Sequence, residues 1–260
     1  MGNPAADHTF REVMTVAPPA TATPFDQATR DFVFGQVWTR PGLSRRDRRW
    51  ITLTCVAAAD APQPIDDHVY AGMNSGDIAL AEMLEFVLQF AVYCGWPKAS
   101  HVEGVIRRQR ARIQQERGEE PRPWPLLDNA ALGPNDWEQR LDGGAKEFAD
   151  VNLVPAPQPD SPYTHAGILS YVFGHVWQRP GLSRRDRRLI TVACVAIDDS
   201  PIPLKTHVAS ALQSGDITKA EMDELILHFS AYYGFAKGEA LQASADDAWT
   251  RLHGQPVKQP

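Results

Sequence analysis

The decapeptide RPGLSRRDRR occurs twice in the chain, at residues 40–49 and again, unchanged, at residues 179–188. At the offset of 139 residues that this repeat sets, residues 32–97 align with residues 171–236 without a gap and agree at 37 of 66 positions. A match of this length indicates an internal duplication, and its long period excludes a short-repeat solenoid. The sequence therefore predicts two domain-sized copies of one fold.

The pattern inside each copy is helical. A Pro-Gly turn precedes Ser44, which with Asp47 three residues later forms a capping-box variant at the start of a helix. Pro64 suits a first helical position and places His68 in the first turn, and Asp77 is the expected cap of the helix that follows. The predicted helices of the first copy are 25–38, 44–59, 65–74, 78–94 and a charged helix ending near 117. No segment alternates as a strand does, so the expected fold class is all-α.

The boundary between the copies is predicted in a stretch rich in proline and charge. We expect a first repeat at 1–120, a linker at 121–135 and a second repeat at 136–260.

Composition narrows the class of protein. The 260 residues are 43% apolar, which is enough for a real core, and the net charge of −6 argues against a nucleic-acid partner. No apolar run approaches the roughly 20 residues of a membrane span, and the first residues lack a signal pattern, so we expect a cytoplasmic protein without a membrane partner. The three cysteines form no CxxC pair, and we find no metal motif and no cofactor fingerprint.

A polar stripe on an apolar helix is the first candidate for chemistry. In MLEFVLQFAVYCG (83–95) three polar side chains recur at every fourth position, and the second copy repeats them. The stripes consist of Glu85, Gln89 and Tyr93, and of Glu224, His228 and Tyr232. Buried carboxylates and imidazoles are costly without partners. The stripe therefore indicates a site wall, with a structural hydrogen-bond network or a subunit contact as the alternative.

His68 and His207 occupy equivalent positions in the two copies. An imidazole titrates near neutral pH and can act as acid or base, and a helix N-terminus would favour its neutral form. We predict His68 and His207 as catalytic, with Glu85 and Glu224 as their carboxylate partners.

The arginines of the decapeptide cannot all face one way. For most of them the expected role is a salt bridge to acids such as Asp47, Asp66 or Glu85. Four others are candidates for holding a substrate carboxylate, because a guanidinium fork suits that task. They are Arg40, Arg48, Arg179 and Arg187.

The repeated order of FG-VW-RPGLS, a histidine, SGDI and AE--E resembles the carboxymuconolactone decarboxylase family, here as a tandem fusion. The resemblance implies the all-helical alkylhydroperoxidase D-like fold. Single-repeat members assemble as rings, so it also implies a homo-oligomer, with a trimer favoured for a fused pair.

Two features depart from that family. The segments before His68 and His207 contain no CxxC pair, which argues against a thiol peroxidase because no dithiol can be oxidised. The family's helix motif usually reads Arg-Glu, whereas Arg49 and Arg188 stand in the glutamate's place here.

The sequence thus favours a cofactor-free lyase, a decarboxylase or isomerase, acting on a small carboxylated lactone or related ring acid. In each copy an arginine would orient the carboxylate, a tyrosine would stabilise charge on a carbonyl oxygen, and the histidine would return a proton to carbon. One set is Arg40 or Arg48, Tyr93, His68 and Glu85; the other is Arg179 or Arg187, Tyr232, His207 and Glu224, with His228 making the sites unequal. The alternative is a non-catalytic ligand-binding or assembly protein. The sequence leaves open whether a site lies within or between the copies.

Overall fold

The computed structural model describes residues 3–198 and 200–254. Every regular element in these ranges is a helix, which confirms the all-α prediction. The first copy consists of α1 (Pro4–Met14), α2 (Pro24–Ala28), η1 (Thr29–Val37), α3 (Arg45–Ala58), α4 (Pro62–Asn74), α5 (Leu80–Cys94) and α6 (Trp96–Arg117). After the 3-10 turn η2 (Asn129–Leu132) come α7 (Trp137–Asn152), η3 (Tyr163–Val176), α8 (Arg184–Ile197), α9 (Pro201–Ser214), α10 (Lys219–Tyr233) and α11 (Phe235–His253).

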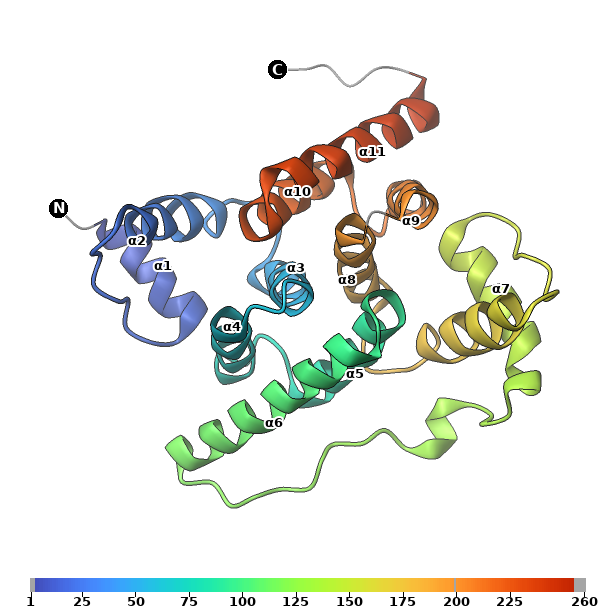
Figure 1. The fold of residues 1–260 in the computed structure, drawn as a ribbon, viewed down its shortest axis with the longest axis horizontal. Helices are drawn as coiled ribbons and strands as arrows, with labels where there is room; N and C mark the ends of the chain where they lie inside the picture. Colours follow the sequence, from blue (N-terminus) through green and yellow to red (C-terminus); the bar gives the residue numbers. More distant parts are fainter. Residues whose placement is uncertain (1–2, 199, 255–260) are drawn as a thin grey trace.

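The helices α3 and α8 lie at the centre of the molecule and pack against each other (Figure 1). Their flanking helices cross between the copies, because α5 of the first copy packs on α8 and α10 of the second packs on α3. One continuous apolar core contains residues of all four helices, including Ile51, Phe86, Ile190 and Phe229. The two copies therefore fold around a shared core, and each supplies a wall to the other.

The repeated decapeptide holds the two copies together. Arg46 donates to Asp186 of the other copy at 3.1 Å, and Arg185 donates to Asp47 at 3.2 Å. The indole Nε1 of Trp50 also donates to Asp186, at 2.7 Å. The prediction that these arginines form salt bridges is confirmed.

Of the acids named from the sequence, Asp47 and Glu85 do pair with decapeptide arginines, but with Arg185 and Arg179 of the second copy rather than with those of their own. The arginines of the first decapeptide have other partners. Those partners are Asp77, Glu82, Asp186 and Glu224. Asp66 pairs instead with Arg108, which lies on α6.

Two predicted helix starts also differ from the structure. The helix α4 begins at Pro62 rather than after Pro64, so His68 lies in its second turn. The helix α5 begins at Leu80, and the Glu82 carboxylate accepts from the backbone N–H of Ala79 at 2.8 Å. Asp77, the predicted cap, accepts from arginines on α3 instead.

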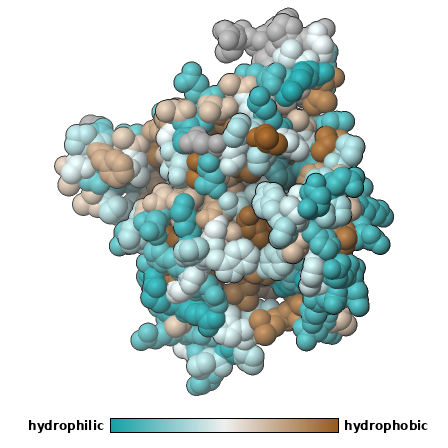
Figure 2. All heavy atoms as spheres, turned by 45° about the vertical axis from the view of Figure 1, so that its right-hand side comes forward, coloured by the Kyte–Doolittle hydropathy of each residue, from teal (hydrophilic) through white to brown (hydrophobic). Residues whose placement is uncertain are grey.

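Segments η1 and η3 are π-helical, and they end in matching bonds from Trp38 N to Val33 O and from Trp177 N to Val172 O. In Figure 1 the non-helical stretches around η2 run along the lower edge from α6 towards α7. Figure 2 shows the molecule with the right-hand side of Figure 1 brought forward, and on this face small hydrophobic patches lie between larger hydrophilic areas. Within the described ranges, none of the helices is both long and apolar enough to cross a membrane.

The crossing of α7 over η3 depends on Gly144. A Cβ atom at this position would lie 1.8 Å from the carbonyl oxygen of Leu169, a backbone atom that cannot move aside cheaply. Overpacking of this kind costs about 3 kcal/mol, so we expect Gly144→Ala to lower the free energy of unfolding by at least that amount in urea denaturation. The matched control is Gly143→Ala, because a Cβ there meets only the side chain of Gln178, at 3.4 Å. Equal stability of the two variants would contradict this view of the crossing.

Candidate active site

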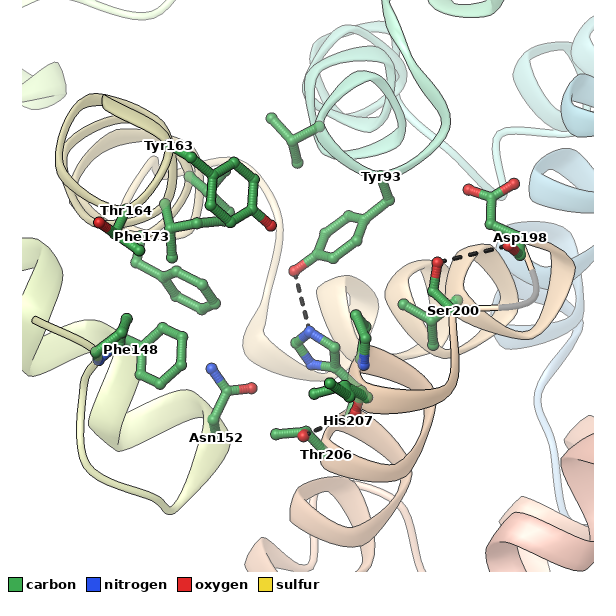
Figure 3. A pocket seen from close by; sticks show the side chains of 17 residues that line it. Tyr93, Phe148, Asn152, Tyr163, Thr164, Phe173, Asp198, Ser200, Thr206 and His207 are labelled. Atoms are coloured by element: carbon green, nitrogen blue, oxygen red, sulfur yellow. Dashed lines mark hydrogen bonds between the residues drawn. The ribbon is translucent and has the colours of Figure 1, made fainter. Parts of the chain in front are cut away.

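A cavity of about 390 Å³ lies between α5 of the first copy and α7, η3 and α9 of the second (Figure 3). Its walls are mainly apolar and aromatic. The lining residues are Val92, Tyr93, Phe148, Asn152, Pro157, Tyr163, Thr164, Ile168, Val172, Phe173, Val195, Asp198, Ser200, Ile202, Pro203, Thr206 and His207. A mainly apolar cavity with a few polar groups is typical of a small-molecule site.

Tyr93 and His207 meet across the two copies in this cavity. The hydroxyl of Tyr93 lies 3.4 Å from Nε2 of His207, and the two rings are nearly perpendicular, with centroids 5.5 Å apart. Behind them, Nε1 of Trp177 donates to the Tyr93 hydroxyl at 2.9 Å. The tryptophan fixes the phenol, and the long contact to the imidazole leaves both groups available to a bound molecule.

Burial lowers the pKa of His207 to about 3, and the positive charge of nearby Arg188 acts in the same direction. The imidazole is therefore neutral at pH 7. The neutral form was predicted, but its cause is desolvation and an arginine rather than the helix N-terminus. Burial raises the pKa of Tyr93, so its hydroxyl keeps its proton at pH 7.

Arg188, the last residue of the second decapeptide, is a structural tether. Its Nε donates to Asp216 at 3.0 Å, its Nη1 donates to Ser210 at 2.9 Å, and its Nη2 donates to the carbonyl of Val151 at the end of α7. Its guanidinium also lies over the ring of Trp177. Arg188 thus holds in place the end of α7, which lines the cavity, and the indole that lies behind Tyr93.

The first copy contains a matching constellation. Nε1 of Trp38 donates to the hydroxyl of Tyr232 at 2.8 Å, and the rings of His68 and Tyr232 have centroids 5.4 Å apart. Burial, followed by the charge of Arg49, lowers the pKa of His68 to about 3.

The predicted grouping of the site residues was wrong in one respect. The sequence analysis grouped each tyrosine with the histidine of its own copy, whereas Tyr93 meets His207 and Tyr232 meets His68. The exchange follows from the packing of α5 on α8 and of α10 on α3. Both sites lie between the copies.

The carboxylates of the two stripes bind arginines rather than the histidines. Glu85 accepts from Nε of Arg179 at 2.7 Å and from its Nη2 at 2.8 Å. Glu224 makes the equivalent pair with Arg40, at 2.8 and 2.6 Å. Glu85 is buried, as predicted, but neither pair lines the cavity that contains His207.

The next position of each stripe binds the remaining predicted arginines. Gln89 accepts from Nη1 of Arg187 at 2.8 Å. His228 lies 3.4 Å from Nη1 of Arg48 through Nδ1 and 2.7 Å from Thr52 through Nε2. Since a guanidinium only donates, Nδ1 is the acceptor and Nε2 carries the proton. Burial, then the charge of Arg48, lowers the pKa of His228.

Several residues that line the cavity or contact Tyr93 have no counterpart among the sequence predictions. Trp177 belongs to the repeated FG-VW motif. A tryptophan and a tyrosine that are both kept in the two copies could have indicated a hydrogen bond between their side chains. Asn152 and Phe148 lie on α7, before the aligned repeat begins at residue 171, and gave no signal. In the described part of the chain no three His, Cys, Asp or Glu side chains form a group suited to a metal ion.

The fold and site define an all-α protein of two fused copies. Two tyrosine–histidine pairs lie between the copies, and each pair takes one residue from each copy. The sequence pattern of the carboxymuconolactone decarboxylase family matches residues 23–108 and 162–247, once in each copy. The chain belongs to this family, as the resemblance of its motifs predicted.

Two relatives carry named activities. The chain is 35% identical over 91 residues to 4-carboxymuconolactone decarboxylase of Acinetobacter baylyi, in an alignment that covers 35% of this chain and 67% of the relative. It is 36% identical over 107 residues to nitrosuccinic acid decarboxylase of Metarhizium robertsii, which covers 39% of this chain and 73% of the relative.

Proposed function

We propose that this protein removes CO2 from a small carboxylic acid bound in the His207 cavity. The observation that carries the proposal is the tyrosine–histidine pair in a mainly apolar cavity, in a chain whose two named relatives are decarboxylases. A carboxylated lactone stays the predicted substrate, and a trimer in the cytoplasm stays the predicted setting.

The apolar wall contributes to the reaction. Among the described residues that line the cavity there is no arginine or lysine. A carboxylate bound there loses its hydration and gains no fixed cation, so its charged form is destabilised. The departing CO2 is neutral and loses little by being in apolar surroundings. This difference lowers the barrier to breaking the C–C bond. Arg179 and Arg187 are already engaged by Glu85 and Gln89, so we assign them a structural role.

The electron pair left by CO2 moves to an electron-accepting group of the substrate, where negative charge develops on oxygen. The Tyr93 hydroxyl, held by the Trp177 N–H, donates to that oxygen. The negative charge that remains on the substrate after CO2 has left raises the pKa of His207, because a nearby negative charge favours the imidazolium. His207 then gives its proton to carbon, and solvent replaces it. One proton enters and one CO2 leaves per turnover.

The test is release of CO2 from nitrosuccinate, 4-carboxymuconolactone and acetoacetate by the purified protein. We expect at least one acid to turn over, and His207→Gln to lower kcat at least about a hundredfold, the usual contribution of an acid–base group. The control is His101→Gln, a surface histidine that pairs with Asp60. Turnover unaffected by His207→Gln, or binding of these acids without CO2 release, would overturn the proposal, and the second result would favour a binding protein.

A further inference from the structure

The two tyrosine–histidine sites of this chain differ at one wall. Their backbones correspond closely there, since both α1 and α7 end in a left-handed residue, at Thr15 and Leu153. In both sites the last arginine of the decapeptide donates to a backbone carbonyl two residues before that left-handed residue. Arg49 donates to Val13, and Arg188 donates to Val151. The last residue of each helix therefore occupies the same place in its site. It is Met14 in the first copy and Asn152 in the second.

Asn152 is a buried polar side chain without a partner. It is only 4% exposed, and its Oδ1 has no hydrogen-bond partner among the residues that the structure describes. Figure 3 shows its amide pointing into the cavity between Phe148 and His207. A buried amide without a partner is costly, so its presence indicates a binding partner that the protein itself does not supply.

Met14 leaves the first site without such a group. It is buried in an apolar cluster with Phe34 and Trp38, against which Tyr232 packs. The aromatic pairs behind the two walls are otherwise alike, because Phe10 meets Phe34 at 4.6 Å and Phe148 meets Phe173 at 4.8 Å between ring centroids. The polar amide is thus a specific difference at a matched position, and Asn152 lies outside both segments that match the family.

We propose that Asn152 contacts the substrate and makes the His207 cavity the working one of the two sites, a role that rests on the proposed decarboxylase function. The side-chain amide of Asn152 can turn over, so that its N–H takes the place of the unpaired Oδ1 and donates to the electron-accepting oxygen of the acid, beside the Tyr93 hydroxyl. The substrate is then a small acid with a second, uncharged oxygen group, such as a nitro, lactone or keto group. A saturated acid of equal size lacks the acceptor for this bond.

The test uses binding as well as turnover. 3-Nitropropanoate, the acid that loss of CO2 from the nitro-bearing carbon of nitrosuccinate leaves, is compared by titration calorimetry with butanoate, which has no second oxygen group. We expect wild type to bind 3-nitropropanoate at least about tenfold more tightly, and Asn152→Leu to lose that difference. A milder variant, Asn152→Ser, should lose most of it while keeping the fold, which thermal melting checks. Met14→Leu is the matched control and should keep the full difference.

The outcomes separate this inference from the proposed function. Asn152→Leu that keeps the preference for 3-nitropropanoate overturns the inference, whether or not CO2 is released from any acid. So does a wild type that binds the two acids equally, and so does Met14→Leu losing the preference to the same extent. Where an acid does turn over, we expect kcat of Asn152→Leu to fall about a hundredfold, as it does when one donor to a developing oxyanion is removed. Loss of turnover in His207→Gln but not in Asn152→Leu would support the proposed function and contradict the role of Asn152.

Discussion

Replacing Arg188 by methionine is expected to lower the free energy of unfolding by about 3 kcal/mol, measured by urea denaturation. The guanidinium is almost fully buried and donates to a carboxylate, a hydroxyl and a carbonyl at once, those of Asp216, Ser210 and Val151. Methionine keeps much of the volume but donates nothing, so three acceptors lose their partner. Asp216 is partly exposed and recovers some hydration, which keeps the expected loss at the lower end of the range for broken buried pairs.

The matched control for that variant is Arg184→Met, one turn earlier on the same helix. Arg184 is 38% exposed and pairs with Glu147 at 2.9 Å. Glu147 is only 14% exposed, but the guanidinium of Arg184 keeps contact with water, so we expect a loss of about 1 kcal/mol, well below that of Arg188→Met. Two equal losses would show that Arg188 acts as an ordinary surface charge and not as a tether between α8 and the end of α7.

The fold could be predicted from the sequence because its signals are local. The capping box at Ser44 and the apolar helix with a stripe at Glu85 depend on spacings within one helix, and the structure has them. The duplication needs only a comparison of the sequence with itself. Which helix faces that stripe is not a local property. A period of four residues identifies a face of α5, but the shared core decides that this face meets α8 of the other copy. The tyrosine and histidine of one site therefore come from different copies.

The rest of the candidate site could not be predicted from the sequence, for two reasons. Arginines that suit a substrate carboxylate also suit Glu85 or Glu224, and the sequence cannot tell which acid they bind. Asn152 is one polar residue at the end of a helix whose counterpart in the first copy ends in Met14. A comparison of the copies that starts at residue 32 cannot show that difference.

Stability is expected to fall steeply in mild acid because His68 and His207 are buried in the neutral form. Each has a folded-state pKa of about 3, depressed first by burial, against about 6.5 in the unfolded chain. Below pH 6.5 the unfolded state therefore binds protons that the folded state does not bind. The free energy of unfolding falls as the pH falls towards 3. Between pH 7.5 and 5.0 each histidine should cost about 2 kcal/mol, and the pair about 4 kcal/mol.

The measurement is urea denaturation at several pH values for the wild type and for the His68→Gln/His207→Gln double variant. Buried His228 and half-buried His175 have lowered pKa values too and add loss of the same sign, so the double variant should keep a shallower slope rather than none. Carboxylates with lowered pKa values, such as Asp186 and Glu224, lose their contribution only as the pH falls below their unfolded values, which leaves the window above pH 5 to the histidines. Equal slopes for the two proteins in that window would mean that His68 and His207 take up protons in the folded state as they do in the unfolded chain, so that burial does not hold them in the neutral form.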